Sequence, residues 1–579
     1  MSLLSIVIIS AVVLFAAYRV YGSYLARMLR LDPQAPTPAV RMRDDLDYMP
    51  LEPKSLLSQH FSAIAAAGPI VGPILAGVMF GWLPALIWII VGSIFIGGVH
   101  DITALVASIR HRARSIAEVV REHMSRRSYV LFLIFVWLAL DYIIVAFTDI
   151  TASSFVGMID LESGEKVSGG GIATSSILYL ILPVMMGFLL RFTRLKIGPA
   201  TIIFLPLVGL SIWVGQYVPF NLDSALGIPQ PDAHRIWNIA ILAYCFVASV
   251  VPVWSLLQPR GHLGGYFLFF TLVGGSLGLI FSGERTVYPA FTNWVTPTGQ
   301  PLFPMLFITI ACGACSGFHA VIASGTTSKQ LRRETDAKII GYGAMLLEGM
   351  FAVVSLACVM RIASDSPLLA GPGGAKPNFL YALGIGSFLG VLGVPASFGV
   401  SFALMAFTTF VYDTLDVCTR LGRYIIEELT GWRTRGGKAF AAIATVGAPL
   451  PFLLQNNVDA TGAPIPVWKV FWELFGASNQ LLAALTLIGV TVWLWRTQRS
   501  KAILFVTGIP TVIMYVMSTW ALLRIIRTEF TLNGLSAGAV AWVAVILVAL
   551  AAMMLIDAFI VFVVPPAPPP ERRLEPTPA

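Results

Sequence analysis

The stretch 303–329, FPMLFITIACGACSGFHAVIASGTTSK, constrains the fold most, because it begins as an apolar membrane helix and then stops being one. After Ile310 its residues become small and polar. In hydrocarbon every backbone N–H and C=O needs a partner, so unwound backbone persists only where protein or a water-filled cavity surrounds it. Close helix packing through small residues would also explain the glycines, but it leaves the ionisable His319 unexplained. We therefore predict a broken helix that contributes to a solute site.

The composition indicates an integral membrane protein. Of 579 residues, 57% are hydrophobic and 12% are charged, whereas soluble chains carry about 25% charged residues. The net charge of +8 does not indicate nucleic-acid binding, because the cations form short clusters between apolar runs. The five cysteines lie in or beside apolar segments, which argues against a secreted disulfide framework. We interpret Cys312 and Cys315 as packing residues, and expect no metal and no cofactor.

Apolar segments predict an all-α polytopic protein with about 15 or more transmembrane helices, since one span needs about 20 mostly apolar residues. We expect the spans to begin near residues 3, 62, 83, 129, 174, 198, 237, 264, 303, 339, 378, 439, 468, 502 and 537. The glycine-rich region 378–418 counts as one net crossing, with room for a re-entrant piece or two short helices. A single membrane domain would cover 1–564. The proline-rich tail 565–579 is expected to be disordered and cytoplasmic.

Basic loops predict the orientation. Five clusters of Lys and Arg lie in the loops 110–127, 191–196, 329–338, 420–438 and 496–501. An even number of predicted spans separates each successive pair, so all five can lie on one side. By the positive-inside rule this side is cytoplasmic. The N-terminus is then periplasmic and the C-terminus cytoplasmic.

A second broken helix is predicted at 59–77, where Gly68-Pro69 and Gly72-Pro73 follow each other closely. Proline removes a backbone donor and glycine permits unusual dihedral angles, so we expect an interruption at mid-depth; a simple kink is the alternative. This segment would run in the opposite direction to 303–327, which is the pattern of an inverted repeat. The two segments are seven predicted spans apart, so a five-helix repeat would need extra helices between its halves.

Six stretches resemble the carbon starvation protein (CstA) family. They are QHFSAIAAAGPIVGPILAG (59–77), GGVHDITALVASIRHRARSIAEVV (97–120), FPMLFITIACGACSGFHAVIASGTTSKQL (303–331), TDAKIIGYGAMLLEG (335–349), TLDVCTRLGRY (414–424) and ELFGASNQLLAALTL (473–487). The resemblance implies a bacterial inner-membrane importer with a LeuT-like inverted-repeat core. It also implies uptake of peptides or pyruvate in carbon starvation, with proton coupling for the pyruvate carriers.

Ionisable residues inside the membrane are candidates for proton coupling, because each costs at least about 2.5 kcal/mol at a helix centre. The candidates are His60, His100, Asp101, Asp141 and Glu348. Glu348 stands alone in an apolar span, and a lysine from another helix is the alternative reason for its presence. A proton relay and a structural pair that anchors the Arg-rich loop are equally open for His100 and Asp101.

Two further acidic pairs have alternatives of their own. Asp141 and Asp149 lie nearly on one helical face, where they could relay a proton or hold a cation. Alternatively, Asp149 is near the outer surface and merely solvated. We expect Asp413 and Asp416 to form a surface charge network with Arg420 and Arg423.

The substrate site is expected between the two interruptions, at Gly68 to Pro73 and at Gly313 to Gly317. Freed amide ends carry a partial positive charge that suits a carboxylate. The candidate residues are Gly68, Pro69, Gly72, Gly313, Ser316, Gly317, His319, Ser324, Asn479 and Gln480. For Asn479 and Gln480, interhelical hydrogen bonding is the alternative to lining the solute path.

The predicted function is that of a proton-coupled importer of small carboxylates, not an enzyme. Its partners would be a peptide or pyruvate, protons and membrane lipid, with no nucleic acid and the oligomeric state open. A channel and a membrane-embedded metal-dependent enzyme remain the alternatives, although no close-spaced motif such as H-E-x-x-H occurs.

Overall fold

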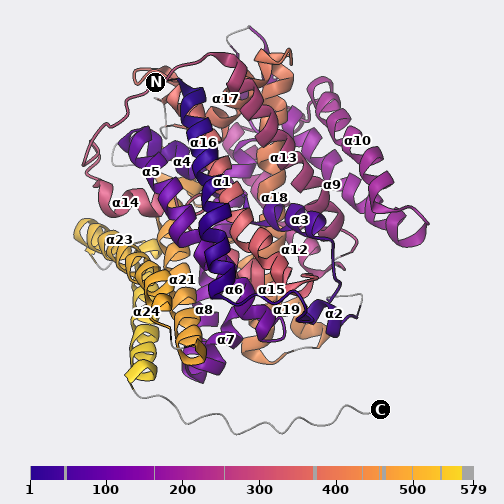
Figure 1. Cartoon of the computed structure of the whole chain (residues 1–579). Coiled ribbons are helices and arrows are strands. Elements are labelled where there is room, and N and C mark those ends of the chain that lie inside the picture. The colour runs from indigo at the N-terminus through magenta and orange to yellow at the C-terminus, as the bar shows by residue number, and fades with distance from the viewer. Residues whose placement is uncertain are drawn as a thin grey trace.

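A computed structural model of the chain describes residues 2–44, 48–161, 164–252, 254–369, 375–432, 434–455, 457–458, 464–498, 500–534 and 538–563. The described chain is a bundle of helices that mostly run between two opposite ends (Figure 1). The expected tail 565–579 lies outside the described residues.

The longer helices form most of the bundle. They are α1 (Leu3–Met28), α3 (Pro53–Ile64), α4 (Gly68–Phe80), α5 (Trp82–Gly92), α6 (Gly98–Arg110), α8 (Arg126–Ser153), α9 (Gly169–Phe192), α10 (Ile197–Tyr217), α12 (Gln230–Val250), α13 (Leu257–Ser282), α16 (Ala344–Met360), α17 (Pro377–Val391), α18 (Ala396–Thr430), α19 (Arg435–Gly447), α21 (Val467–Gln498), α23 (Ile509–Asn533) and α24 (Ala539–Val563).

Shorter elements connect or interrupt them. The short α-helices are α2 (Pro38–Arg41), α7 (Ile116–His123), α11 (Leu222–Leu226), α14 (Leu302–Thr309), α15 (Phe318–Gly325), α20 (Leu450–Leu453) and α22 (Lys501–Ile503). Segments of π-helix are η1 (Ser93–Gly97), η4 (Lys338–Gly343) and η6 (Leu504–Gly508), and 3-10 turns are η2 (Thr327–Lys329), η3 (Glu334–Asp336) and η5 (Pro367–Leu369). Two antiparallel hairpins pair β1 (Met158–Asp160) with β2 (Lys166–Ser168), and β3 (Asn457–Val458) with β4 (Pro464–Ile465).

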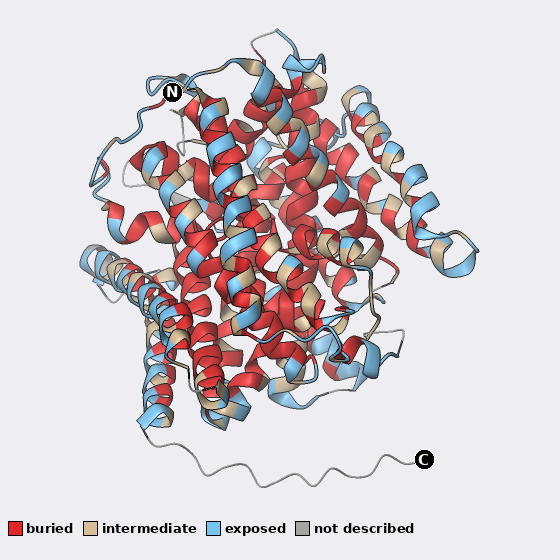
Figure 2. Cartoon of the chain, viewed as in Figure 1, coloured by how far each residue is buried: buried red, intermediate tan, exposed pale blue. Residues whose placement is uncertain are grey.

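The number of spans agrees with the prediction. In the described residues 13 helices are long and apolar enough to cross a membrane, or up to 14 with the bent pair α3 and α4 as one span. The short helices α14 and α15 together form the second broken span. The peripheral helices α1, α10, α23 and α24 leave apolar side chains exposed (Figure 2), whereas the membrane-spanning part of α21 is buried throughout. An exposed apolar surface of this kind is typical of helices that face lipid.

The region 378–418 contributes one crossing, as predicted, although it contains two helices. Near the first end of α17, Asn378 donates to Ser154, which lies just after α8. Near its other end, the ring of Phe388 lies under the guanidinium of Arg361, just after α16. Since α8 and α16 both start from basic loops and finish at the opposite end of the bundle, both ends of α17 lie at that opposite end. Of the two helices in this region, only α18 therefore runs through the bundle.

The first break lies earlier in the chain than predicted. Helix α3 ends at Ile64 and α4 begins at Gly68, with a bend of 47° between them. Pro69 therefore stands in the first turn of α4 and Pro73 inside it. Proline is well tolerated at a helix start, because its missing N–H would have no helical partner there. The Gly-Pro steps begin the second half-helix, so the predicted interruption between Gly68 and Pro73 is wrong by a few residues.

The second break agrees with the prediction. Helix α14 ends at Thr309 and α15 begins at Phe318. The two broken helices cross in opposite directions, since Gly68 lies against Cys312 and Gly72 against Thr309. Helices α9 and α10 pair at one edge of the bundle (Figure 1). If they are left out, five spans run from α3 to α13 and five from α14 to α21, which is the number that an inverted repeat of five helices requires.

Candidate functional site

Four buried side chains form a continuous chain beside the second break. His100 Nδ1 lies 2.7 Å from Asp101 Oδ1, and Asp101 Oδ2 lies 2.8 Å from Nδ1 of His319. On its other side, His319 Nε2 lies 3.2 Å from Glu348 Oε2. None of the four side chains is more than 1% exposed. His319 therefore bridges two carboxyl groups, and both belong to predicted candidates.

This arrangement can move a proton. Transfer between His319 Nε2 and a Glu348 oxygen would exchange an ion pair for a neutral pair, and Asp101 would stabilise the imidazolium form. Neither Glu348 oxygen has a well-aligned hydrogen bond in the described structure, and His100 Nε2 has none. Buried polar atoms are nearly always paired, so atoms without a partner indicate a functional role. The alternative of a lysine partner for Glu348 is wrong, because its ionic partner is His319.

The local fold explains why these residues meet. His319 is the second residue of α15, directly after the unwound segment. Asp101 lies at the start of α6, just after the π-helical segment η1. Glu348 lies at the start of α16, just after the π-helical segment η4. The two spans pack closely at these points, since Gly98 lies against the ring of Tyr342. Segments of π-helix are rare and are frequently found at functional sites.

Helix α21 supplies the polar groups that hold the second break. Asn479 Oδ1 accepts from the backbone N–H of Phe318 at 3.0 Å, and its Nδ2 donates to Ser316 Oγ at 3.0 Å. Gln480 Nε2 donates to the Phe307 carbonyl at 2.5 Å. These contacts satisfy backbone groups that the break leaves without helical partners. They confirm the interhelical role considered for Asn479 and Gln480.

The predicted substrate-binding glycines lie at tight contacts between helices. A Cβ atom on Gly68 would lie 2.3 Å from Cys312 Sγ, and one on Gly72 would lie 2.5 Å from the Thr309 carbonyl oxygen. At Gly313 it would lie 2.7 Å from Ala352 Cβ, and at Gly317 it would lie 2.4 Å from the Asn479 carbonyl oxygen. In this conformation the four glycines face protein atoms.

The remaining substrate-binding candidates are buried as well. Pro69 lies in the first turn of α4, and Ser316 is fully buried beside Asn479. Ser324 Oγ donates to the Ala320 carbonyl at 2.7 Å within α15.

Among the described residues, two proton-coupling candidates are not hydrogen-bonded to the four buried side chains beside the second break. His60 Nδ1 lies 2.9 Å from Thr327 Oγ1, and its Nε2 has no hydrogen-bond partner in the described structure. Asp141 is buried on α8, and its Oδ1 also lacks a partner there. The neighbouring Asp149 is fully buried and accepts from Asn238 Nδ2 at 3.1 Å and from the Trp468 N–H at 2.9 Å. The alternative of a solvated Asp149 is therefore wrong.

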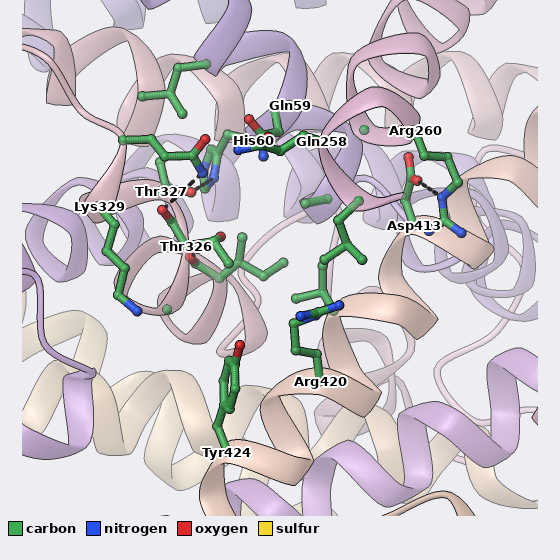
Figure 3. A pocket seen from close by; sticks show the side chains of 18 residues that line it. Gln59, His60, Gln258, Arg260, Thr326, Thr327, Lys329, Asp413, Arg420 and Tyr424 are labelled. Atoms are coloured by element: carbon green, nitrogen blue, oxygen red, sulfur yellow. Dashed lines mark hydrogen bonds and ion pairs between the residues drawn. The ribbon is translucent and has the colours of Figure 1, made fainter. Parts of the chain in front are cut away.

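A cavity of about 70 Å³ lies between α3, α13, α15 and α18 (Figure 3). Its polar lining includes Gln59, His60, Gln258, Arg260, Thr326, Thr327, Lys329, Asp413, Arg420 and Tyr424. A wider groove of about 810 Å³ at the end with the basic loops shares Gly325, Lys329 and Tyr424 with it. The cavity thus reaches from this groove to His60, on the half-helix that leads into the first break.

The sequence prediction missed Arg260, which is 1% exposed. Its Nε lies 2.7 Å from Asp413 Oδ1, and its Nη1 lies 2.6 Å from Asp416 Oδ2. The expected surface network of Asp413 and Asp416 with Arg420 and Arg423 is therefore wrong, because both carboxylates are buried and pair with α13. A signal was available, since Arg260 opens an otherwise apolar span and a buried arginine needs anionic partners.

Arg420 differs from Arg260 in its contacts. Its Nη2 donates to the carbonyls of Ala248 and Val251, at 2.7 and 2.6 Å, and its Nε has no hydrogen-bond partner in the described structure. Together with Lys329 it adds positive charge to the wall of the cavity (Figure 3).

The family model of the carbon starvation protein CstA matches residues 2–370 and 367–521. The chain belongs to the CstA family. It is 31% identical over 615 residues to the pyruvate/proton symporter BtsT of Escherichia coli (strain K12), covering 92% of this chain and 83% of that protein. It is 33% identical over 560 residues to the peptide transporter CstA of the same organism, covering 86% and 77%. The peptide transporter CstA of Bacillus subtilis (strain 168) is 31% identical over 613 residues, covering 97% and 96%.

Solved structures give a more distant likeness. MhsT in complex with L-phenylalanine aligns with a TM-score of 0.45 at 12% identity, over 88% of this chain and 99% of that one. The Eremococcus coleocola manganese transporter, in complex with an aromatic bis-isothiourea substituted compound, aligns with a TM-score of 0.45 at 13% identity, over 90% and 99%. At these identities the likeness indicates neither the substrate nor the coupling ion of this CstA-family protein.

Proposed function

We propose that this protein is a proton-coupled secondary importer of small carboxylate nutrients, peptides or pyruvate, across the bacterial inner membrane. The observation that carries the proposal is the position of His319 between Asp101 and Glu348, directly after the unwound segment of the second broken helix. The pyruvate/proton symporter and the peptide transporters among its relatives support the same conclusion.

The four buried side chains, from His100 to Glu348, would couple proton movement to the geometry of the breaks. Protonation of Glu348 removes one of the two negative charges beside His319, and so weakens the attraction between α16 and α15. Because His319 begins α15, this change acts on the half-helix whose first N–H group is held by Asn479. Loosening at this point would allow the breaks to separate and admit a solute. The coupling is thus a local change of charge acting on an element that can move.

The cavity supports an anionic substrate. Arg420 and Lys329 contribute positive charge to its wall, while Arg260 is occupied by two carboxylates. An arginine with an unpaired Nε suits a carboxylate, which pyruvate and a peptide C-terminus share. We propose that this cavity is the cytoplasmic part of the solute path, and that Gln59 and His60 line its inner end.

The relay also favours transport over the two other function classes. Among the described residues, His111, Glu122 and His123 have the spacing of metal ligands. The four buried side chains beside the second break do not form such a group. A channel would need no titratable group at its centre, and it cannot drive accumulation. Uptake against a concentration gradient, driven by pH, separates the carrier from the channel.

The deciding experiment compares wild type and Glu348→Gln in proteoliposomes. The glutamine keeps the size of the side chain but cannot take up the proton. We expect wild type to accumulate labelled pyruvate or a labelled dipeptide when the outside is acidic, and Glu348→Gln to fall to background. Exchange of substrate at equal pH should persist in the variant, because it requires no net proton movement.

Glu473→Gln is the matched control, since Glu473 is a partly buried glutamate outside the four-residue group that accepts a hydrogen bond from Gln300. It should accumulate substrate as wild type does. Accumulation by Glu348→Gln at the wild-type level would reduce Glu348 to a structural role. Uptake that requires sodium and ignores pH would overturn proton coupling itself.

A further inference from the structure

A second cluster of ligand-type side chains lies outside the proposed transport path, at the end of the bundle that carries the basic loops. His111 follows the last residue of α6, and Glu122 and His123 end α7. One ligand atom from each residue lies within 4.8 Å of the other two. The two histidines are partly buried and Glu122 is exposed.

The hydrogen bonding of His111 leaves a lone pair directed into the cluster. Its Nδ1 lies 2.6 Å from the Ala107 carbonyl oxygen, so Nδ1 carries the proton of the neutral ring and donates it. Nε2 of His111 then has a free lone pair, and it lies 2.8 Å from Nε2 of His123. Two lone pairs cannot face each other at this distance, so either a proton or a cation must lie between the nitrogens.

The surroundings hold the two rings in place. The rings are nearly perpendicular, at 88°, and the edge of His111 also contacts Trp493 on α21, with centroids 5.5 Å apart. Arg496 Nη1 donates to the His123 carbonyl at 2.9 Å. The bond from His111 to a backbone carbonyl is the outer-sphere contact that orients most metal-binding histidines.

The carboxylate of the cluster is available for a ligand. On the same helix, Glu118 is engaged by Arg114 at 3.6 Å and by Arg121 at 3.2 Å. Glu122 forms no ion pair in the described structure, and its exposed side chain can turn toward the histidines.

We propose that His111, His123 and Glu122 bind one divalent transition-metal ion of the zinc class, which would fasten the end of α6 to α7 beside α21. Two imidazoles and a carboxylate favour zinc-like ions over magnesium or calcium, which prefer oxygen ligands. Three protein ligands leave a fourth position for water. Tetrahedral bonds of about 2.1 Å separate two nitrogens by about 3.4 Å, so binding requires the rings to part by about half an ångström.

The test uses the full chain, purified in detergent with an affinity tag that contains no histidine and stripped with a chelator. Titration with Co²⁺ should produce visible absorption bands that saturate at one equivalent per chain, and Zn²⁺ should displace them. His111→Ala and His123→Ala should each weaken Zn²⁺ binding by well over tenfold, since changes in the outer sphere alone weaken it by about 10- to 100-fold. Glu122→Gln should weaken it less.

Glu118→Gln is the control on the same helix, and it should bind as wild type does. Gel filtration and the melting temperature show whether each variant is folded. If an alanine variant misfolds, His123→Gln takes its place, because it keeps a side chain that can hydrogen-bond to His111. Two results would show that the pair shares a proton and holds no metal. One is the absence of saturable binding in wild type, and the other is binding by the His111 and His123 variants that is as tight as that of wild type.

Discussion

At the scale of single residues, Asn479 shows how a broken helix is kept in place. Its side-chain oxygen accepts from the Phe318 N–H, and its backbone carbonyl accepts from the Gly317 N–H at 3.1 Å. The amide nitrogen reaches Ser316 Oγ at 3.0 Å and Cys312 Sγ at 3.5 Å. One residue of α21 therefore contacts both the start of α15 and the unwound segment before it.

We predict that Asn479→Ala lowers the stability of the protein. The buried N–H of Phe318 would lose its acceptor, and an unsatisfied buried donor costs about 1–3 kcal/mol. The melting temperature in detergent should fall by several degrees, and uptake should fall with it. Ser478→Ala is the control on the same helix, because among the described residues Ser478 Oγ bonds only to the carbonyl of Phe475, within α21. An unchanged melting temperature for Asn479→Ala would mean that water satisfies the Phe318 N–H.

The sequence identifies several residues of the candidate site but not their contacts. Glu348 and His319 are recognisable because an ionisable side chain in an apolar span is costly. The contact between His319 and Asp101 is not recognisable, since these two residues are 218 positions apart in the sequence and meet only through the packing of separate spans. The partner of Asp413 was missed for the same reason, because Arg260 lies on a different helix.

At the scale of elements, the two broken helices depend on glycine where they cross. The Cα of Gly72 faces the backbone of Thr309 and Ile310, and backbone atoms cannot turn aside as a side chain can. A methyl group there would have to push α4 away from α14. The crossing is therefore a contact of backbone against backbone, which only small residues permit.

Gly72→Ala should separate the two half-helices and abolish uptake. A Cβ would lie 2.5 Å from the Thr309 carbonyl oxygen. Overpacking of a core typically lowers the free energy of unfolding by about 1–3 kcal/mol, so we also expect a lower melting temperature. Gly447→Ala is the matched control, since Gly447 also lies in a helix and its Cβ would meet open space. Normal uptake by Gly72→Ala would show that the breaks are not held together by this contact.

Element by element, the sequence predicts the breaks better than their limits. Small polar residues located the second break correctly, because they cannot form a stable span in lipid. The Gly-Pro steps misplaced the first break, since proline at a helix start was read as proline in a helix interior. The π-helical segments η1 and η4 carry no sequence pattern, because they arise where two packed spans adjust to each other.

At the scale of the whole molecule, the charges of the loops agree with the contacts of the structure. The basic loops contact one another at one end of the bundle. Arg110 Nε lies 2.8 Å from Glu334 Oε1, and Arg496 donates to the His123 carbonyl. The opposite end holds the turn between α17 and α18, and a bridge between Ser2 and Arg285. The number of crossings could thus be predicted from the apolar segments and checked by parity. The cavity could not be predicted, because its wall comes from four separate helices.

The last prediction concerns the orientation of the cavity. Thr326 lines it close to the basic loops, while Leu392, 42% exposed, lies in the turn after α17 at the other end. All five native cysteines are buried, so wild type is a suitable blank for labelling. We expect a membrane-impermeant maleimide to label Leu392→Cys in spheroplasts and Thr326→Cys only in inside-out vesicles.

Substrate should slow the labelling of Thr326→Cys and leave that of Leu392→Cys unchanged, because a carboxylate held near Arg420 would occupy the same cavity. The reagent must be polar, since it reaches only positions connected to water. Labelling of Leu392→Cys in inside-out vesicles alone would reverse the proposed orientation. If the reaction at Thr326→Cys proceeds at the same rate with and without substrate, in a variant that still transports, then the cavity does not lie on the solute path and the cations in its wall serve only to hold α18 in place.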